Sequence, residues 1–243
     1  MSVRGIDCVR IARVPEHPLI LLASNSPRRR ALLSLTGWTF EVAPAHVDER
    51  PRAGEKPADY VVRLARTKAL ALAGRAAHRD RVILAADTTV VEAGDILGKP
   101  RDADEATAML RRLRGRVHQV YTALALLRPR ENGLLTDLCV SDVTMRHYSD
   151  EEIEAYVRSG DPLDKAGAYA IQHPLFRPVE RLEGCFAGVM GLPLCHLRRA
   201  MRSFGLTPPN DVAATCQEAL QVTCPIAHVV LASNTQQPFE GIE

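Results

Sequence analysis

The run Ser24-Asn25-Ser26-Pro27-Arg28-Arg29-Arg30 combines small hydroxyls with three arginines. Ser26 suits the N-cap of a helix and Pro27 its first position, so the arginines fall in the first turn. That end of a helix already carries partial positive charge, and the arginines conflict with it. A bound phosphate would resolve the conflict, because backbone N–H groups, hydroxyls and guanidinium groups can converge on it. The alternative is a solvated basic turn, and both interpretations stay open.

A second group of candidate residues is acidic. Asp87, followed by Thr88, comes directly after the apolar run 82–86, which is typical of a buried strand. A carboxylate there lies on a rigid element at the edge of a cleft, where α/β proteins place catalytic groups. Glu49 is a second acid that could reach the same edge. Two carboxylates with substrate phosphates form a typical magnesium or manganese site. Taken singly, Asp87 could equally cap a turn.

Two further segments carry groups suited to a phosphorylated ligand. Gly98-Lys99-Pro100 lacks the preceding glycines of a P-loop, but its lysine can still meet a phosphate as a point charge. The segment 159–172 places acids, Lys165 and small residues before Gln172, whose amide can read a base edge as donor and acceptor. The alternative is a loop in which Asp164 and Lys165 form a structural ion pair. The sequence shows no Ser/His/Asp hydrolase elbow, zinc cluster or dinucleotide fingerprint.

Alternating strands and helices must position these residues. The apolar patterns predict strands over 19–23, 82–90, 96–97, 117–127, 138–145 and 179–182. They predict helices over 28–35, 58–73, 103–113 and 194–204, and the capping-box pair Ser149 and Glu152 predicts another that closes at Gly160. Hairpins are predicted at 92–95 and around Asn132-Gly133. Because hairpins interrupt the alternation, the fold class is α/β with a mixed sheet.

The bulk composition is that of an ordinary globular protein. The chain has 243 residues, 46% hydrophobic and 25% charged, which suits one bilobed domain or two small ones. Its net charge of +2 is too mild to indicate duplex nucleic acid or a membrane surface as a partner. No apolar run is long enough to span a membrane, and charges interrupt any signal peptide at Arg4, Asp7, Arg10, Arg13 and Glu16. We therefore expect a cytoplasmic protein.

The cysteines are scattered along the chain. They are Cys8, Cys139, Cys185, Cys195, Cys216 and Cys224, and none forms a C-x-x-C pair. At this length disulfide dependence is not expected, and reduced thiols are the default. Cys216 and Cys224 lie close together in the sequence, so a disulfide or metal clip in the tail is the alternative.

The chain resembles the Maf family of nucleoside triphosphate pyrophosphatases over about 19–204. Five motifs occur in the family's order: Ala23-Ser24-Asn25-Ser26-Pro27-Arg28-Arg29, Val47-Asp48-Glu49, Ala86-Asp87-Thr88, Gly98-Lys99-Pro100, and Asp164-Lys165-Ala166-Gly167-Ala168-Tyr169 continuing to Gln172. Each motif alone is weak, but the ordered set is specific.

The resemblance implies a two-lobed α/β fold of the Maf and ITPase type with a central nucleotide cleft, and a homodimer. It implies hydrolysis of nucleoside triphosphates to the monophosphate and pyrophosphate with a divalent metal, Mg or Mn. The implied roles are catalysis for Asp87, metal binding for Glu49 and Asp87, and substrate specificity for Arg28, Thr88 and Gln172. The resemblance also implies that Ser24, Arg29, Lys68, Lys99 and Lys165 bind phosphate, with Asp164 beside them. The Arg-Thr-Gln combination resembles the dTTP/UTP branch.

Three departures from that branch stand out. The loop 173–178 replaces a glycine-bearing one beside the base, Gly184-Cys185-Phe186 stands where a small residue and Tyr are usual, and the tail after Gly205 has no counterpart. We expect an extension over 1–18, a pyrophosphatase domain over 19–206 and a C-terminal extension over 207–243. The alternatives are the same chemistry on a modified purine such as 7-methyl-GTP, or a non-catalytic nucleotide-binding regulator of cell division.

Overall fold

The computed structural model describes residues 19–233 and 240–241, so the predicted extension 1–18 lies outside the described residues. Its strands are β1 (Ile20–Leu22), β2 (Phe40–Val42), β3 (Val82–Glu92), β4 (Asp95–Leu97), β5 (Val117–Arg128), β6 (Gly133–Met145), β7 (Val179–Glu183) and β8 (Glu240–Gly241). Its helices are α1 (Pro27–Ser34), α2 (Pro57–Ala73), α3 (Ala103–Leu113), α4 (Asp150–Arg158), α5 (Phe186–Met190), α6 (Leu194–Ser203), α7 (Val212–Leu220) and α8 (Ala227–Ala232). Short 3₁₀ turns are η1 (Ala76–His78), η2 (Pro129–Glu131), η3 (Asp161–Asp164) and η4 (Ala166–Ala168).

The described strands form one mixed sheet. Its order is β2-β1-β3-β5-β6-β7, with β4 paired to β3 and β8 paired to β6. β1 runs parallel to β2 and β3, whereas β3, β5, β6 and β7 are joined antiparallel. The mixed sheet predicted from the two hairpins is therefore confirmed.

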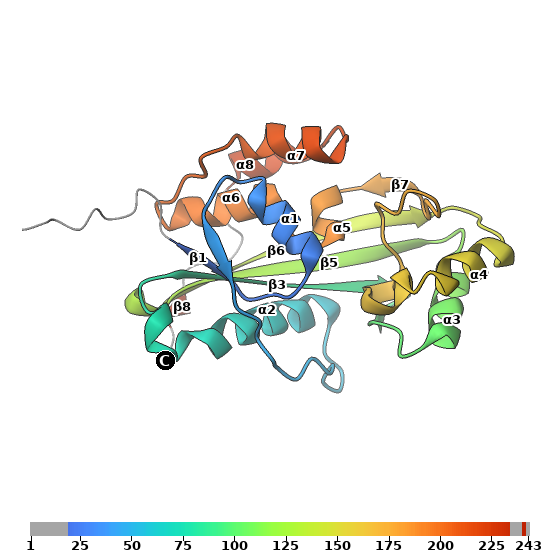
Figure 1. Ribbon diagram of the computed structural model, residues 1–243, viewed down its shortest axis with the longest axis horizontal. Coiled ribbons are helices and arrows are strands. Elements are labelled where there is room, and N and C mark those ends of the chain that lie inside the picture. Colours follow the sequence, from blue (N-terminus) through green and yellow to red (C-terminus); the bar gives the residue numbers. More distant parts are fainter. Residues whose placement is uncertain (1–18, 234–239, 242–243) are drawn as a thin grey trace, which may run out of the picture.

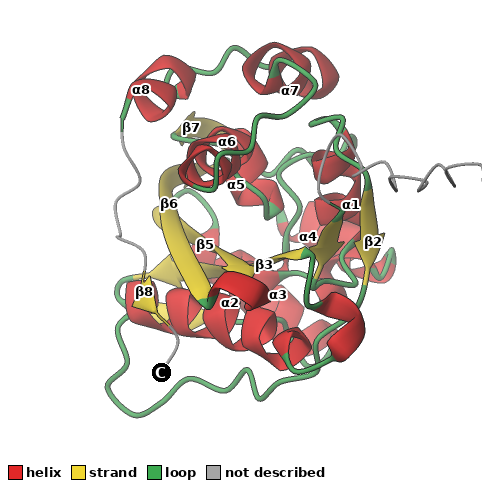
Figure 2. Ribbon diagram, turned by 90° about the vertical axis from the view of Figure 1, so that its left-hand side faces the viewer, coloured by secondary structure: helices red, strands yellow, loops and turns green. Residues whose placement is uncertain are grey.

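Helices cover both faces of this sheet (Figures 1 and 2). Alternate residues of a strand point to opposite faces, so neighbouring residues of β1 and β3 enter different cores. Leu22 and Leu84 pack with α1 and α6, whereas Leu21 and Ile83 pack with α2. Burial on both faces explains why these strands read as continuous apolar runs.

A third core lies at the far end of the long strands. There α3 and α4 pack on the ends of β3, β5 and β6, around Leu110, Val143 and Tyr148 (Figure 1). The long strands thus carry one group of helices at each end, and the predicted two-lobed α/β architecture is confirmed.

One edge of β3 is paired only at its two ends. β1 pairs with 82–84 of β3, and β4 pairs with 90–92. Between them, 85–89 of β3 pair with β5 on the other side. This gap in the pairing is the place where a cleft can reach the middle of the sheet.

Most predicted elements are present within a residue or two. Ser26 caps α1 by accepting from the Arg29 amide, and the capping box of Ser149 and Glu152 begins α4. The prediction for β6 was wrong at its start, because the strand begins at Gly133 and not at Leu138. Asp137 interrupts the apolar pattern there, but it is buried in a bidentate ion pair with Arg199 of α6, at 2.6 and 2.9 Å.

The tail after Gly205 contains two helices that the sequence pattern did not predict. Val212 of α7 is fully buried and joins the core that α1 and α6 share with the sheet. α8 packs beside Cys195 of α6 through Ala227 and Val230. Arg199 donates to Ser233 Oγ at 2.6 Å, which ties the end of α8 to the ion pair with Asp137. α7 and α8 form a layer on α6 (Figure 2), whereas β8 pairs with the start of β6.

Two further expectations from the sequence concerned membrane spans and disulfides. Among the described residues, no helix is both long and apolar enough to cross a bilayer. Cys139, Cys185, Cys195, Cys216 and Cys224 are all free thiols, so the tail disulfide considered from the sequence is not formed; Cys8 lies outside the described residues.

Candidate active site

A cleft of about 810 Å³ opens at the gap along β3. It is bounded by the β1–α1 loop, the segment 44–51, the loop after β4, the region from η3 to Gln172, and the end of α5. All eleven residues singled out by the sequence line it: Ser24, Arg28, Arg29, Glu49, Lys68, Asp87, Thr88, Lys99, Asp164, Lys165 and Gln172. Segments far apart in the chain are therefore brought to one cavity.

The floor of the cleft holds two acids bridged by a lysine. Asp87 lies in the middle of β3 and points to the α2 side of the sheet, where Lys68 Nζ donates to its Oδ1 at 2.6 Å. The same ammonium is 2.7 Å from Glu49 Oε1. Asp87 and Lys68 are only 6% and 7% exposed, whereas the Glu49 side chain is 47% exposed. The strand predicted over 82–90 continues through Asp87 as β3, and its pairing with β5 holds the backbone of this acid in place.

The two acids differ in proton affinity. Burial raises the pKa of Asp87 above its ordinary value, although Lys68 and Arg29 act in the opposite direction. Partial burial also disfavours the charged form of Glu49, but the hydrogen bond and charge of Lys68, with Lys99 and Arg29, outweigh it and lower the pKa of Glu49. The surroundings thus shift the pKa values of the two carboxylates in opposite directions, a feature common in acid–base sites.

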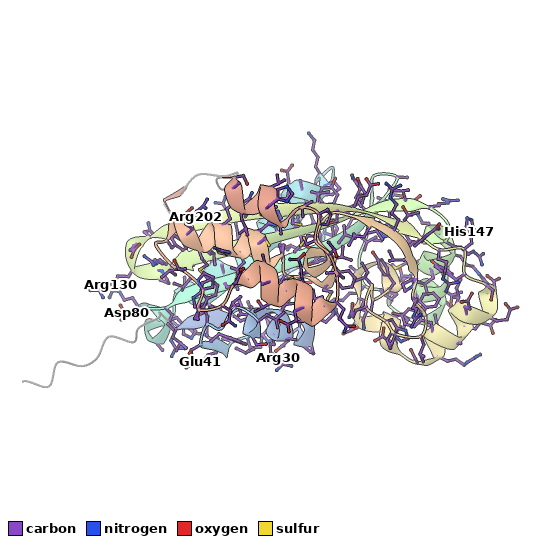
Figure 3. All side chains as sticks on the ribbon, turned by 90° about the horizontal axis from the view of Figure 1, so that it is seen from above. Arg30, Glu41, Asp80, Arg130, His147 and Arg202 are labelled. Carbon is purple, nitrogen blue, oxygen red and sulfur yellow. The ribbon has the colours of Figure 1, made fainter. Side chains whose placement is uncertain are left out.

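The β1–α1 arginines separate into two kinds. Arg29 turns inward and donates to Gly191 O at 2.8 Å, Thr88 Oγ1 at 3.2 Å and Ser24 Oγ at 3.4 Å. Burial lowers the pKa of Arg29, and Asp87 partly offsets this. Arg28 also lines the cleft, with its NH1 3.6 Å from Asp164 Oδ2. Arg30 is exposed and lies at the molecular surface (Figure 3).

The opposite wall is built by Lys165 and its acidic neighbours. Lys165 Nζ donates to Asp161 O at 2.6 Å, Asp161 Oδ1 at 2.9 Å and Asp164 Oδ1 at 2.6 Å. An ammonium has three donors, so these acceptors use all of them. The structural ion pair considered from the sequence is therefore present, and a phosphate at Lys165 would have to replace one of these acceptors. Lys99 lies exposed at the cleft rim.

Gln172 begins the loop that departs from the family pattern. Phe176 anchors this loop, stacking on Tyr156 with ring centroids 4.3 Å apart. Tyr156 Oη also accepts from the Ala170 amide at 3.0 Å and donates to Asp161 Oδ2 at 2.6 Å. Tyr156 therefore connects the wall around Lys165 with the segment that carries Gln172.

Several supporting residues were missed by sequence reasoning. Tyr60 of α2 donates to Glu49 O at 2.9 Å and so fixes the otherwise irregular segment that carries this acid. Tyr156 connects two walls, and the Gly191 carbonyl orients Arg29. The two tyrosines read as ordinary core positions of helices, and a backbone carbonyl leaves no signal in a sequence.

The carboxylates of the cleft suit a hard cation such as Mg²⁺ only together with ligands from a bound substrate. No group of three or more His, Cys, Asp or Glu side chains able to hold a metal occurs among the described residues. Mg²⁺, however, is usually bound by one or two carboxylates together with substrate phosphates and waters. Glu49 and Asp87 supply two such carboxylates, both held by Lys68 through one oxygen each. The site therefore suits a metal that arrives with a phosphorylated substrate.

Comparison with known proteins finds a matching family model and several similar proteins that share one name. A family model described as Maf-like protein matches residues 19–204. The dTTP/UTP pyrophosphatase of Hahella chejuensis is 47% identical over 81% of this chain and 98% of that protein. That of Geobacter sulfurreducens is 47% identical over 78% of this chain and 98% of that protein. That of Thermomicrobium roseum is 44% identical over 89% of this chain and 97% of that protein.

Solved structures match more distantly. The nucleoside-triphosphatase / dITP/XTP pyrophosphatase from Mycobacterium abscessus is 18% identical, with a TM-score of 0.34 over 53% of this chain and 73% of that chain. The Ham1 protein of Staphylococcus aureus is 14% identical, with a TM-score of 0.37 over 53% of this chain and 72% of that chain.

Proposed function

Because the chain belongs to the Maf-like protein family, we propose that it hydrolyses nucleoside triphosphates to the monophosphate and pyrophosphate, with dTTP and UTP preferred. The observation that carries the proposal is the convergence of five sequence motifs on one cleft with an acid–lysine–acid group at its floor. A pure nucleotide sensor has no need of a buried acid whose pKa is raised beside an ionised one.

In the proposed mechanism the protein mainly positions groups and neutralises charge, as phosphoryl-type transfer requires. Arg28, Arg29 and Lys99 neutralise the triphosphate, while Ser24, Lys68 and Lys165 bind neighbouring oxygens. Asp87 orients or deprotonates the attacking water. Glu49 and Asp87 would hold a divalent cation, and that cation would supply further neutralisation of the phosphate charge. Arg28, Thr88 and Gln172 select the base.

The test is pyrophosphate release across a panel of canonical and modified triphosphates, with and without a chelator. We expect kcat/KM for dTTP and UTP to exceed that for ATP and GTP by about tenfold or more, since contacts to a base discriminate on this scale. Chelation should abolish release. Faster hydrolysis of a GTP derivative than of UTP would contradict the base preference. Release of orthophosphate and diphosphate would contradict the site of cleavage.

The domain boundaries give a second proposal. We place the catalytic domain at 19–206 and treat 207–243 as an extension that contributes none of the motif residues. The family resemblance also supports a homodimer.

Truncation before Thr207 should leave turnover per folded molecule within a few-fold of the full chain. It should lower the melting temperature, because Val212 and Cys216 fill the core beneath α7 and Arg199 loses its bond to Ser233. The measurement is a thermal melt beside turnover normalised to folded protein. A hundredfold loss of normalised turnover would show that the tail completes the site.

A further inference from the structure

A second cavity lies away from the cleft, beneath the tail. It has a volume of about 200 Å³ and lies between α5, α6, α7 and the loop 222–225. Most of its lining is apolar, but four cysteines from four different segments also face it: Cys185, Cys195, Cys216 and Cys224. We call this cavity the thiol pocket. Four of the chain's six cysteines meet here, although no two of them are close enough in sequence to form a motif.

The four thiols are not equivalent. Cys185 caps α5, its Sγ accepting from the Gly188 amide at 3.2 Å, so it is engaged in local structure. Cys216 belongs to the main core. Cys195 is buried, and the partly exposed Cys224 packs against the cluster that contains it. The Cys224 amide donates to Gln217 Oε1 at 2.8 Å, which fixes the backbone of that residue. Cys195 and Cys224 therefore belong to the same packing cluster, and Cys224 is the more exposed of the two.

The thiol pocket favours a neutral adduct of its thiols over a metal ion bound by thiolates. Burial raises the pKa of both Cys195 and Cys216 to about 12, so these thiols are protonated at neutral pH. A metal held by several thiolates would place net negative charge among apolar side chains, which is costly. In agreement, no preformed cluster of three metal ligands is found in the described residues. An adduct that consumes two thiols and stays neutral avoids that cost.

We propose that the thiol pocket binds small neutral reagents that form covalent bonds to two protein thiols at once. Monosubstituted trivalent arsenicals are an example of this class, and Cys224 and Cys195 are the two residues that the arsenic bridges. For phenylarsine oxide, two As–S bonds form and the arsenic–oxygen double bond breaks. The two thiol protons leave with that oxygen as one water, so no oxidant or reductant is needed. An apolar cavity of about 150 Å³ accommodates benzene, so the phenyl ring fits this one.

The thiol pocket shares one short helix with the cleft. Cys185, Phe186 and Ala187 face the pocket, while Val189, Met190 and Gly191 line the cleft. Gly191 O, at the end of α5, accepts a hydrogen bond from the Arg29 guanidinium at 2.8 Å. A shift of α5 would therefore also move Arg29 in the cleft. Occupation of the pocket should therefore lower turnover several-fold.

The experiment is intact-mass spectrometry of the full chain treated with phenylarsine oxide in excess glutathione, which suppresses adducts on single thiols. We expect one phenylarsenic unit per chain, bound with loss of two thiol hydrogens and removed by a dithiol but not by more glutathione. Cys224→Ser and Cys195→Ala should each retain none. Cys216→Ala, a matched change in the same pocket, should retain one. Thermal melts of each variant confirm that it is folded.

Equal labelling of Cys224→Ser and the parent chain would overturn the proposal, as would no labelling of the parent. Loss of the adduct in Cys216→Ala with retention in Cys195→Ala would overturn the assigned pair. The mass readout does not require the proposed hydrolase activity. Turnover with and without the arsenical, in the parent and in Cys224→Ser, tests the coupling through α5 separately.

Discussion

Asp87→Asn is expected to lower turnover by about 10²–10⁴-fold, the range contributed by a positioned general base. The substitution keeps the shape of the side chain and its place in β3 but removes both the charge and the basicity. Lys68 and Arg29 remain near it, so nucleotide should still bind. The measurement is pyrophosphate release at saturating UTP, together with nucleotide affinity by calorimetry. Near-native turnover in this variant would place the catalytic acid elsewhere.

The matched control for this variant is Asp80→Asn. Asp80 is an exposed aspartate that pairs with Arg130 at 3.0 Å, and both lie together at one end of the molecule (Figure 3). Neither residue is among those that line the cleft. This control should retain full turnover. A similar loss in both variants would indicate a general effect on the protein and not a role of Asp87 in the site.

Lys68→Met is expected to lower kcat/KM by about 10²–10³-fold, comparable to the loss of one electrostatic donor in other active sites. Methionine preserves most of the side chain's length, so the main change is the loss of the ammonium between Asp87 and Glu49. Two carboxylates then face the incoming triphosphate without that charge between them. The measurement is kcat/KM for UTP at several metal concentrations. Activity restored by more metal would mean that the lysine only balances charge.

Stability must be followed beside activity in this variant. Removal of one partner from a buried ion pair costs about 3–5 kcal/mol, and Lys68 is buried. Turnover is therefore referred to the folded fraction measured in a thermal melt. Lys56→Met is the control, since Lys56 is exposed at the start of the same helix. Equal losses in both variants would argue against a special role of Lys68.

Much of the framework could be predicted because its signals are local. The start of α1 depends on Ser26 and Pro27, and the start of α4 depends on Ser149 and Glu152, which lie within a few residues of the backbone groups they satisfy. The strands of the central sheet were recognisable because both of their faces are buried. Among the site residues, the ordered motifs supplied the positions, and the fold brings all of them to one cleft.

The elements that were not predicted depend on distant contacts. α5 has only five residues and contains Gly188, so its sequence carries little helical preference. α7 and α8 are held by burial of Val212 and Val230 against α6 and not by strong periodicity. For the same reason Asp137 resembled a strand break, since its partner Arg199 lies 62 positions further along the chain.

The ion pair of Asp137 and Arg199 also constrains how the sequence can change over generations. Loss of either partner alone strands a buried charge, whereas replacement of both by apolar residues of similar volume is often neutral or stabilising. A lineage that loses the pair one substitution at a time must therefore pass through a destabilised single mutant. Asp137 and Arg199 should accordingly be replaced together in related sequences. Ser233, whose hydroxyl accepts a hydrogen bond from Arg199, should vary only where another group can accept that bond.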